Sequence, residues 1–349
     1  MNLLLFNLRV DRDDTALGFT TDWINELAKH FDHVTVITMF SGTLAVASNV
    51  EVISAGLEKG LSKPRRVFEF YWGLWRALRS RHHDVCFAHM MPLFLVLASP
   101  LLSFRRIPAC LWYAHNHKSL LLPIATAIAC KVLTSTPTAF PLETPKLRVI
   151  GQGIDTDRFR PLANERDKTI RLMTVGRITP VKNIDLMIRA FARLRDQRPG
   201  LHAEFLIIGE PLSARDTEYL NECQTLSNSL GLETVVSWMP PVPFHSVHEA
   251  YQQGDIFLSA CSSGLDKTIL EAMASGLSVV AMHRAVAEPL GAYLARDEGT
   301  FGESLVSLCD LAGGDRAALG LRLRNFVVRD HSLVRLGRRI SDELMEMTA

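Results

Sequence analysis

The strongest constraint on this chain is the regular alternation of short apolar segments with longer segments typical of amphipathic helices. Short buried strands that alternate with helices predict a parallel sheet covered by helices on both faces. The alternation runs through two successive series, separated by the turn-rich stretch 151–161. A chain of 349 residues is also too long for one core of ordinary size. We therefore predict an α/β protein with two Rossmann-like, doubly wound domains.

The predicted elements divide between the two domains. In the first series we predict strands at 2–8, 33–38, 50–53, 85–88, 110–114 and 132–135, and helices at 18–30, 64–81, 92–103 and 118–129. In the second we predict strands at 170–175, 203–208, 235–238, 255–259 and 278–282, and helices at 183–194, 213–230, 243–253, 267–275, 302–311 and 316–328. The domains are then 1–152 and 153–330, with a last helix within 331–349 packing back on the first. Ligands of such domains bind at the carboxyl ends of strands, so we expect the active site in the cleft between them.

Composition excludes several classes of protein. The formal net charge is +1, and no nucleic-acid-binding motif is present, so we expect no nucleic-acid partner. The six cysteines lack the spacing of metal ligands and are interpreted as reduced core residues. The apolar opening stretch has no basic residue ahead of it, and no window approaches the roughly 20 apolar residues of a membrane span. We expect a cytoplasmic protein.

The first candidate site is the loop from Val175 to Asn183, which holds Arg177 and Lys182 between a predicted strand and the start of a helix. Two cations beside a helix N-terminus can stabilise a diphosphate, because the helix dipole and the free amides add to their charge. The alternative is an ordinary solvated loop with two surface charges. Asn183 is a plausible N-cap of the following helix.

The second candidate site is the stretch 255–276, where a strand ends in a loop of small residues that leads into a helix. The loop 261–266 can present amide groups to an anion, and Gly276 is placed to end the helix. Glu271 lies one turn into that helix. It either faces the loop as a ligand or only complements the helix dipole.

Together these motifs resemble the family-four group of retaining glycosyltransferases, which have the GT-B fold of two Rossmann-like domains. The matching residues are Gly176-Arg177, Lys182-Asn183, Ala190-Phe191 and Glu271-Ala-Met-Ala-Ser-Gly276, with further matches at 149–161, 207–210 and 255–259. The resemblance covers roughly residues 149–283 in the family's order and spacing. It implies a nucleotide-sugar-binding second domain and an acceptor-binding first domain.

The resemblance also implies roles for single residues. Arg177 and Lys182 would bind the donor diphosphate, and Glu271 would bind the ribose hydroxyls. His115, at the end of a predicted strand, would reach a sugar hydroxyl, although it is alternatively only a turn residue. The remaining donor-binding candidates are Gly18, Ser263, Gly264, Leu265, Asp266, Lys267, Thr268, Met239 and Pro240, the last two bordering the base.

Two positions depart from the family pattern. The family usually has a glutamate eight residues before the matching Glu271, where this chain has Ser263. Asp266 is then a candidate acceptor for a sugar hydroxyl, and Lys267 adds charge near the phosphates. The family also commonly has paired glycines after the first strand, where this chain has Gly18 alone. The Ser263 substitution leaves the identity of the sugar open and, to a lesser degree, the activity, and Gly18 is alternatively only a helix start.

Two further features invite binding hypotheses. The Asp-x-Asp pairs at 11–13 and 155–157 lie in turn-rich segments, where Asp commonly bonds the backbone, so we expect no metal. The segment 63–83 combines six Lys/Arg with a series of aromatic residues. Such a helix can lie on an anionic membrane, which would make the protein peripheral on the inner face of the membrane. The alternative is a core-packing helix with a solvated basic face.

The leading hypothesis is therefore a metal-independent, retaining glycosyltransferase of polysaccharide or glycoconjugate biosynthesis. It would use a nucleoside diphosphate sugar of the UDP or GDP type, without a cofactor, and a glycan, lipid-linked or small-molecule acceptor. One alternative is a nucleotide-sugar epimerase on the same fold. Another is a degenerate protein that binds a nucleotide sugar or glycan without turnover, as the Ser263 substitution would allow.

Overall fold

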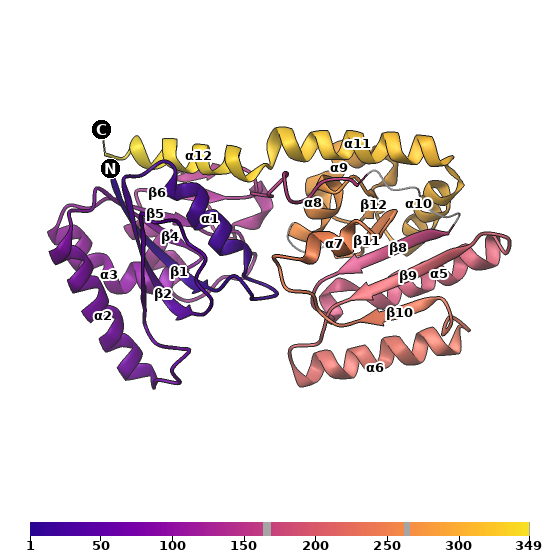
Figure 1. Cartoon of the computed structure of the whole chain (residues 1–349), viewed down its shortest axis with the longest axis horizontal. Coiled ribbons are helices and arrows are strands. Elements are labelled where there is room, and N and C mark those ends of the chain that lie inside the picture. The colour runs from indigo at the N-terminus through magenta and orange to yellow at the C-terminus, as the bar shows by residue number, and fades with distance from the viewer. Residues whose placement is uncertain (163–168, 262–265, 349) are drawn as a thin grey trace. The chain divides into compact units, whose positions relative to one another are not determined.

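The computed structural model describes residues 1–162, 169–261 and 266–348. The chain forms two compact units, one made of Met1–Gly153 with the segment that begins at Leu333, the other of Ile154–Ser332. Each unit contains a parallel sheet with helices on both faces, which confirms the predicted fold class (Figure 1).

The first unit is built on a parallel sheet with strand order β3-β2-β1-β4-β5-β6-β7. Its strands are β1 (Asn2–Val10), β2 (His33–Ser41), β3 (Val50–Ser54), β4 (Val85–His89), β5 (Ala109–Trp112), β6 (Lys131–Thr134) and β7 (Leu147–Val149). The order reverses between β1 and β4, because β2 and β3 lie on one side of β1 and the later strands lie on the other. Such a switch point leaves room for a ligand at the carboxyl ends of the two central strands.

Alternate residues of these strands point to opposite faces, and each face has its own helices. One face packs against α2 (Lys63–Ser80), α3 (Pro92–Phe104) and α4 (Leu122–Ile128). The other packs against α1 (Phe19–Ala28) and α12 (Leu333–Met345), so the end of the chain lies on α1, as Figure 1 shows in yellow and indigo. A Cβ at Gly337 of α12 would meet the Glu26 side chain of α1 at 2.5 Å, so glycine permits this close packing.

The second unit is built on a parallel sheet with strand order β10-β9-β8-β11-β12. Its strands are β8 (Ile170–Val175), β9 (Ala203–Ile208), β10 (Val236–Met239), β11 (Ile256–Ser259) and β12 (Ser278–Ala281). Its helices are α5 (Ile184–Gln197), α6 (Ala214–Ser229), α7 (Val247–Tyr251), α8 (Lys267–Ala274), α9 (Ala287–Leu290), α10 (Glu298–Asp310) and α11 (Gly313–Asp330). Short 3₁₀ turns cover Pro180–Lys182, Arg284–Val286 and Gly291–Tyr293, and one in the first unit covers Pro137–Ala139.

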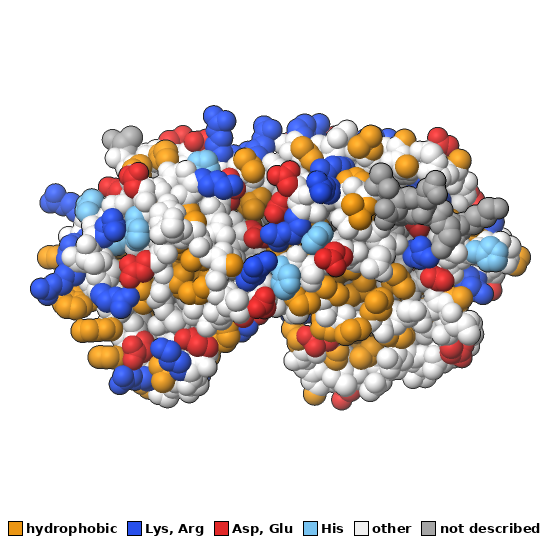
Figure 2. Space-filling view, in the orientation of Figure 1, with side chains coloured by type: hydrophobic (Ala, Val, Ile, Leu, Met, Phe, Trp, Pro, Cys, Tyr) orange, Lys and Arg blue, Asp and Glu red, His pale blue; other side chains and the backbone are white. Residues whose placement is uncertain are grey.

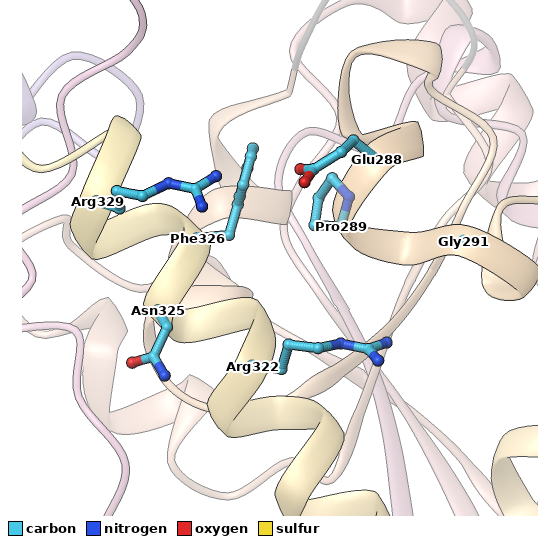
Figure 3. Close-up of a pocket in the computed structure, with 7 residues that line it drawn as sticks. All are labelled: Glu288, Pro289, Gly291, Arg322, Asn325, Phe326 and Arg329. Atoms are coloured by element: carbon cyan, nitrogen blue, oxygen red, sulfur yellow. The ribbon is translucent and has the colours of Figure 1, made fainter.

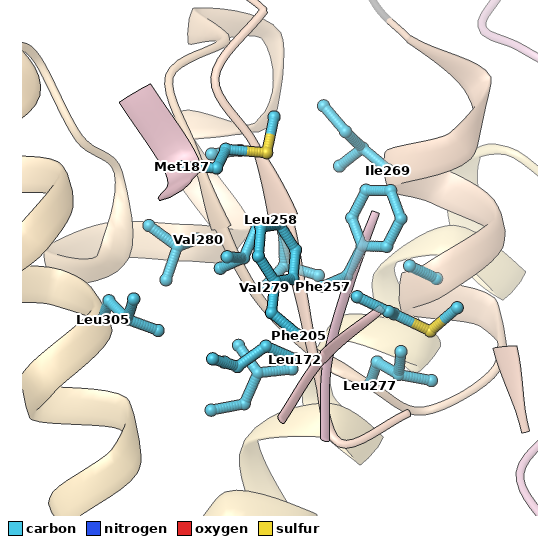
Figure 4. Packing of buried hydrophobic residues seen from close by; sticks show 14 of the residues in the cluster. Leu172, Met187, Phe205, Phe257, Leu258, Ile269, Leu277, Val279, Val280 and Leu305 are labelled. Atoms are coloured by element: carbon cyan, nitrogen blue, oxygen red, sulfur yellow. The ribbon is translucent and has the colours of Figure 1, made fainter. Parts of the chain in front are cut away.

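One apolar core joins the sheet of the second unit to its helices. The central strands contribute residues such as Leu172, Phe205 and Phe257, and the helices contribute Met187 and Leu305 (Figure 4). The apolar face predicted for 183–194 is buried in this core, comprising Ile184, Met187, Ile188, Phe191 and Leu194. Burial on this scale holds the ends of the strands in fixed positions.

Several local expectations differ from the structure, among them the following three. Asn183 immediately precedes α5, but its side chain makes no capping hydrogen bond and its φ of 49° is left-handed. The helix predicted at 118–129 begins only at Leu122, because Pro123 favours the first helical turn and no apolar period precedes it. The three-residue strand β7 was not predicted, since it is too short to show a period of two.

Two observations concern the whole described chain. No described helix is long and apolar enough to cross a membrane. All six cysteines are free thiols, and only Cys130 is exposed.

Candidate functional site

The candidate site of the second unit lies at the switch point of its sheet. β8 is central, with β9 on one side and β11 on the other, so the loops after β8 and β11 leave the sheet at the same edge and diverge. These loops are 176–183, which contains Arg177 and Lys182, and the segment after Ser259 that leads to Asp266 and α8. Both sequence motifs therefore meet where doubly wound sheets bind ligands.

Glycines allow the loops after β8 and β9 to approach each other. Gly176 has a φ of 129°, and Gly209 has a φ of 154°. A Cβ on Gly209 would overlap the carbonyl oxygen of Gly176, so the two backbones are in direct contact. The Gly176 amide donates to the Ile208 carbonyl at 3.0 Å, and the Ile178 amide donates to the Glu210 carbonyl at 3.0 Å. The loop after β8 is consequently held by its neighbour before any ligand arrives.

Asn183 joins this loop to the end of β11. Its Nδ2 donates to the carbonyl oxygen of Ala260 at 2.9 Å, across 77 positions of sequence. The side chain predicted to cap α5 is instead a cross-link between the two loops of the switch point. The left-handed backbone of Asn183, which Asn tolerates better than most residues, turns the chain from the 3₁₀ turn into α5.

Lys182 and Asp266 form an ion pair at the N-terminus of α8. Their side chains are 18% and 15% exposed, respectively. Asp266 caps α8 by accepting the Thr268 amide at 3.3 Å. Burial alone would raise the pKa of Asp266, but the Lys182 charge and the hydrogen bonds from Lys182 and Thr268 hold it below its usual range. The ionised carboxylate of Asp266 therefore pairs with a cation that the sequence analysis assigned to a diphosphate, and it caps the helix whose preceding loop was assigned to an anion.

Glu271 is buried in the same helix, α8. Its side chain is enclosed by the unit, and Tyr251 Oη donates to Glu271 Oε2 at 2.9 Å. Desolvation raises the pKa of Glu271 to about 7, although Lys267, the Tyr251 hydrogen bond and Lys182 oppose the shift. Glu271 is thus a buried carboxyl of the first turns of α8, whereas a side chain that only complements a helix dipole needs no burial. A buried carboxyl that titrates near neutrality is typical of functional sites.

The other predicted residues of this unit are more exposed. Arg177 is exposed and lies near Asp216, which is in the first turn of α6. Hydrogen bonds from Thr179 and Ser213 are the main causes that lower the pKa of Asp216, and the Arg177 charge lowers it further. Met239, at the end of the edge strand β10, is exposed, as is Pro240. The Met239 carbonyl accepts the Gly209 amide at 3.0 Å, which joins this edge to the loops after β8 and β9.

The hydroxyl of Thr268 is buried, and it neither donates nor accepts a hydrogen bond among the described residues. It lies near Gly176, since a Cβ there would be 3.9 Å from Thr268 Cγ2 and 3.6 Å from Lys182 Nζ. A buried hydroxyl without a partner costs free energy unless a ligand or water satisfies it. The other three candidates of this loop, Ser263, Gly264 and Leu265, lie outside the described residues.

The two candidates of the first unit are placed separately, on its own sheet. Gly18 is buried at the start of α1 with an ordinary helical φ of −54°, and its amide already donates to the Asp14 carbonyl at 3.2 Å. His115 is exposed in the loop that follows β5, which ends at Trp112 rather than at Ala114. His115 Nδ1 accepts the His117 amide at 2.8 Å, so one ring nitrogen stabilises the loop and Nε2 carries its proton.

Sequence reasoning missed two buried histidines at strand ends. His89 ends β4 at the switch point of the first unit, and its Nδ1 lies 3.0 Å from Asn7 Oδ1 of β1. His283 follows β12, where burial lowers the pKa of its imidazole and the Asp266 carboxylate opposes that shift. The signal that selected His115, a histidine at the end of an apolar strand, is also present at both of these positions.

A separate pocket of about 430 Å³ lies between α9 and α11. Figure 3 shows Arg322 and Arg329 projecting from α11 on one side, and Glu288 and Pro289 on the other. Gly291, Asn325 and Phe326 complete its lining, which includes none of the predicted site residues. In the described part of the chain, no group of three or more His, Cys, Asp or Glu residues is arranged to hold a metal ion.

Residues 169–310 match the family model described as glycosyl transferases group 1. A curated mannosylfructose-phosphate synthase of Agrobacterium fabrum is 29% identical over 153 residues, which is 41% of this chain and 34% of that protein. A D-inositol 3-phosphate glycosyltransferase of Actinosynnema mirum is 32% identical over 149 residues, which is 39% of this chain and 35% of that protein. The aligned region thus spans about a third of these relatives.

Solved structures resemble the whole chain. HepE of Anabaena, in complex with UDP and glucose, has a TM-score of 0.75 at 14% identity and covers 99% of this chain and 100% of its own. A sucrose-phosphate synthase of Thermosynechococcus elongatus has a TM-score of 0.76 at 15% identity, with 99% of both chains covered. At these identities the likeness concerns the fold, which is the two-domain GT-B fold.

Proposed function

We propose that this chain, which belongs to the group 1 glycosyl transferases with the GT-B fold, transfers a sugar from a nucleoside diphosphate sugar to an acceptor hydroxyl. The anomeric configuration of the sugar is retained. The observation that carries the proposal is the convergence of Lys182, the start of α8 and buried Glu271 at the switch point of the second sheet. All three lie within the segment that matches the family model.

Lys182 and Arg177 stabilise the departing diphosphate. A nucleoside diphosphate leaves with additional negative charge, and fixed cations with a helix N-terminus lower the barrier by holding that charge. Exposed Arg177 can reach the diphosphate from the side of α6, whereas the Thr268 amide and hydroxyl lie at the start of α8. These residues supply the positive charge, so we propose that the reaction needs neither a metal nor a cofactor.

Glu271 accepts hydrogen bonds from the ribose hydroxyls when it is ionised. Tyr251 fixes one of its oxygens, which leaves the other for a ligand. Met239 and Pro240 border the base, which is of the UDP or GDP type. Asp266 accepts a hydrogen bond from a hydroxyl of the transferred sugar, and Lys267 adds positive charge near the phosphates. The first domain binds the acceptor.

The acceptor we propose is a hydroxyl of a glycan, a lipid-linked saccharide or a small molecule, in the synthesis of a polysaccharide or glycoconjugate. The similarity to a mannosylfructose-phosphate synthase and a D-inositol 3-phosphate glycosyltransferase supports a hydroxyl acceptor. The free state of all six cysteines supports a reducing compartment, so we place the protein in the cytoplasm. A lipid-linked acceptor would bring it to the inner face of the membrane.

Calorimetric titration with UDP-, GDP- and ADP-sugars in EDTA tests this proposal. We expect one nucleotide class to bind the wild type. Lys182→Ala should weaken that binding by about a hundredfold, since a buried charge-assisted contact is lost and Asp266 then stands unpaired beside the phosphates. Arg177→Ala should also weaken it, whereas Arg189→Ala, which removes an exposed arginine on α5, should have no effect. Wild-type affinity in both Lys182→Ala and Arg177→Ala would refute the site.

Turnover is measured separately from binding. Incubation of the donor with a panel of acceptors should release the nucleoside diphosphate and glycosylate one acceptor with retention. An isomerised nucleotide sugar in the absence of acceptor would instead identify an epimerase. Binding that Lys182→Ala abolishes, without turnover on any acceptor, would identify a protein that only binds nucleotide sugars.

A further inference from the structure

Helix α2 has an inner face that belongs to the core and an outer face that is unusually apolar. Phe70, Leu74 and Ala77 are buried, and the Phe70 ring lies 4.4 Å from that of Phe94 in α3. The outer face exposes large apolar side chains at helical spacing, with exposed fractions of 42% for Val67, 55% for Phe68, 38% for Tyr71, 53% for Trp72 and 46% for Trp75. Exposed apolar residues are ordinary when scattered, but a cluster of aromatic residues marks a binding surface.

The apolar surface extends to the neighbouring helices on the same face of the sheet. Tyr71 Oη donates to the Leu97 carbonyl at 3.1 Å and so ties α2 to α3. Along α3, Leu93 is 39% exposed and Phe104 is 81% exposed. Beside and within α4, Leu120 and Ile124 are 93% and 48% exposed. Folding therefore leaves the outer side of three adjacent helices partly apolar, although the inner side forms a complete core.

Positive charge surrounds these aromatic side chains. The helix carries five Lys/Arg and a single acidic residue, Glu69, which is paired with Arg65 at 3.0 Å. Arg65 also lies over the Phe68 ring at 5.2 Å, and Arg79 lies over the Trp75 ring at 5.2 Å. Figure 2 shows blue side chains among orange ones at the edge where Figure 1 labels α2. The net charge of the whole chain is only +1, so this charge is local.

We propose that this outer face, formed by α2 with the exposed residues of α3 and α4, docks onto the surface of an anionic lipid bilayer. Trp and Tyr favour the boundary between headgroups and acyl chains, because each has an apolar body and a polar group. Arginine binds lipid phosphates. Because an arginine lies over the Phe68 ring and another over the Trp75 ring, each cation would enter the membrane interface at the same depth as its aromatic ring. The rings of Trp72 and Trp75 stack on each other with centroids 5.1 Å apart, so the two indoles present one joint apolar surface.

A bilayer fits this surface better than a second copy of the chain does. In a symmetric contact, the same arginines of two copies would face each other, and like charges across an interface cost several kcal/mol. An anionic bilayer instead offers phosphates to exposed cations such as Arg79. A bilayer can also cover the convex outer side of a helix, because fluid lipids need no groove of complementary shape. The docking surface lies entirely within the first unit and does not depend on the proposed donor site.

Flotation with phosphatidylglycerol/phosphatidylcholine vesicles tests the proposal. We expect the full chain to bind vesicles rich in phosphatidylglycerol and to bind pure phosphatidylcholine weakly, with loss of binding at high salt. Trp72→Ser/Trp75→Ser should weaken binding by roughly a hundredfold, because two half-exposed indoles no longer enter the interface. Arg79 is an exposed arginine of α2, and Arg105 is an exposed arginine that directly follows Phe104 at the end of α3. Arg79→Gln/Arg105→Gln should weaken binding to the anionic vesicles by roughly 25-fold, about fivefold for each charge removed.

Matched measurements separate docking from other causes. Leu321→Ser/Val328→Ser removes two exposed apolar side chains of α11, in the second unit, and should leave vesicle binding unchanged. Tryptophan emission should shift to the blue on vesicle binding in the wild type but not in the Trp72/Trp75 variant. Vesicle binding that survives the tryptophan substitutions would overturn the proposal. A wild-type dimer in sedimentation that these substitutions dissociate, without vesicle binding, would overturn it in favour of self-association.

Discussion

Replacing Asp266 with Asn tests whether a carboxylate of the protein competes with the donor diphosphate for Lys182. In the structure Asp266 binds Lys182 and accepts the Thr268 amide. Those are the groups that the proposed function assigns to the phosphates. Asn is as good a helix N-cap as Asp, so Asp266→Asn keeps the cap of α8 and removes only the charge. We expect the variant to bind the nucleoside diphosphate more tightly than the wild type does.

The magnitude follows from the geometry of the pair. A phosphate oxygen bonded to Lys182 lies within about 5 Å of the Asp266 carboxylate, where two like charges repel by roughly 3 kcal/mol at an effective dielectric constant of 20. Removal of that repulsion corresponds to about a hundredfold lower Kd. The variant also loses an ion pair whose side chains are less than one-fifth exposed, at a cost of about 2 kcal/mol in unfolding free energy. Its melting temperature should fall by roughly 4–8 °C.

The assay compares the free nucleoside diphosphate with its sugar conjugate in wild type and Asp266→Asn, by calorimetry at neutral pH. The free diphosphate reports only the competition for Lys182. The conjugate also reports any hydrogen bond between Asp266 and a sugar hydroxyl, which Asn would weaken. Equal or weaker binding of the free diphosphate by the variant would refute the competition. A smaller gain for the conjugate than for the free diphosphate would measure the contact with the sugar.

Two further substitutions probe the same loops. Donor affinity should rise between pH 6 and 8 as Glu271 ionises through a pKa of about 7, and Glu271→Gln should show no such rise in calorimetry. The stability of the protein changes with pH in the opposite direction. The folded-state pKa of Glu271 exceeds the ordinary 4.5, so ionisation of Glu271 lowers the free energy of unfolding as pH rises from 4.5 through 7. Between pH 5 and 8 the melting temperature should therefore fall more for the wild type than for Glu271→Gln. Gly209→Ala should lower the unfolding free energy by about 3 kcal/mol, because its Cβ would overlap Gly176. Gly231→Ala, at a φ of 67° with open space around it, is the control and should lower it by about 1 kcal/mol. Chemical denaturation measures both values.

Local patterns in the sequence predicted most of the elements and part of the site. The apolar period of 183–194 predicted the buried face of α5, and alternation of strands and helices predicted both parallel sheets. The motif spacing also selected Lys182 and Glu271, which the structure places in the loop and helix that follow β8 and β11. These inferences succeed because hydrophobic periodicity and turn chemistry act over a few residues, within the reach of a local pattern.

Contacts between distant residues were decided only by the tertiary structure. Lys182 meets Asp266 across 84 positions, and Asn183 meets Ala260 across 77, because β8 and β11 are neighbours in the sheet although β9 and β10 separate them in sequence. Burial of Glu271 against Tyr251, and the resulting pKa, likewise depend on how α7 packs against α8. A short segment determines which residues can form a strand or a charged loop. The order in which strands pair, set by packing over the whole domain, determines which charges come together.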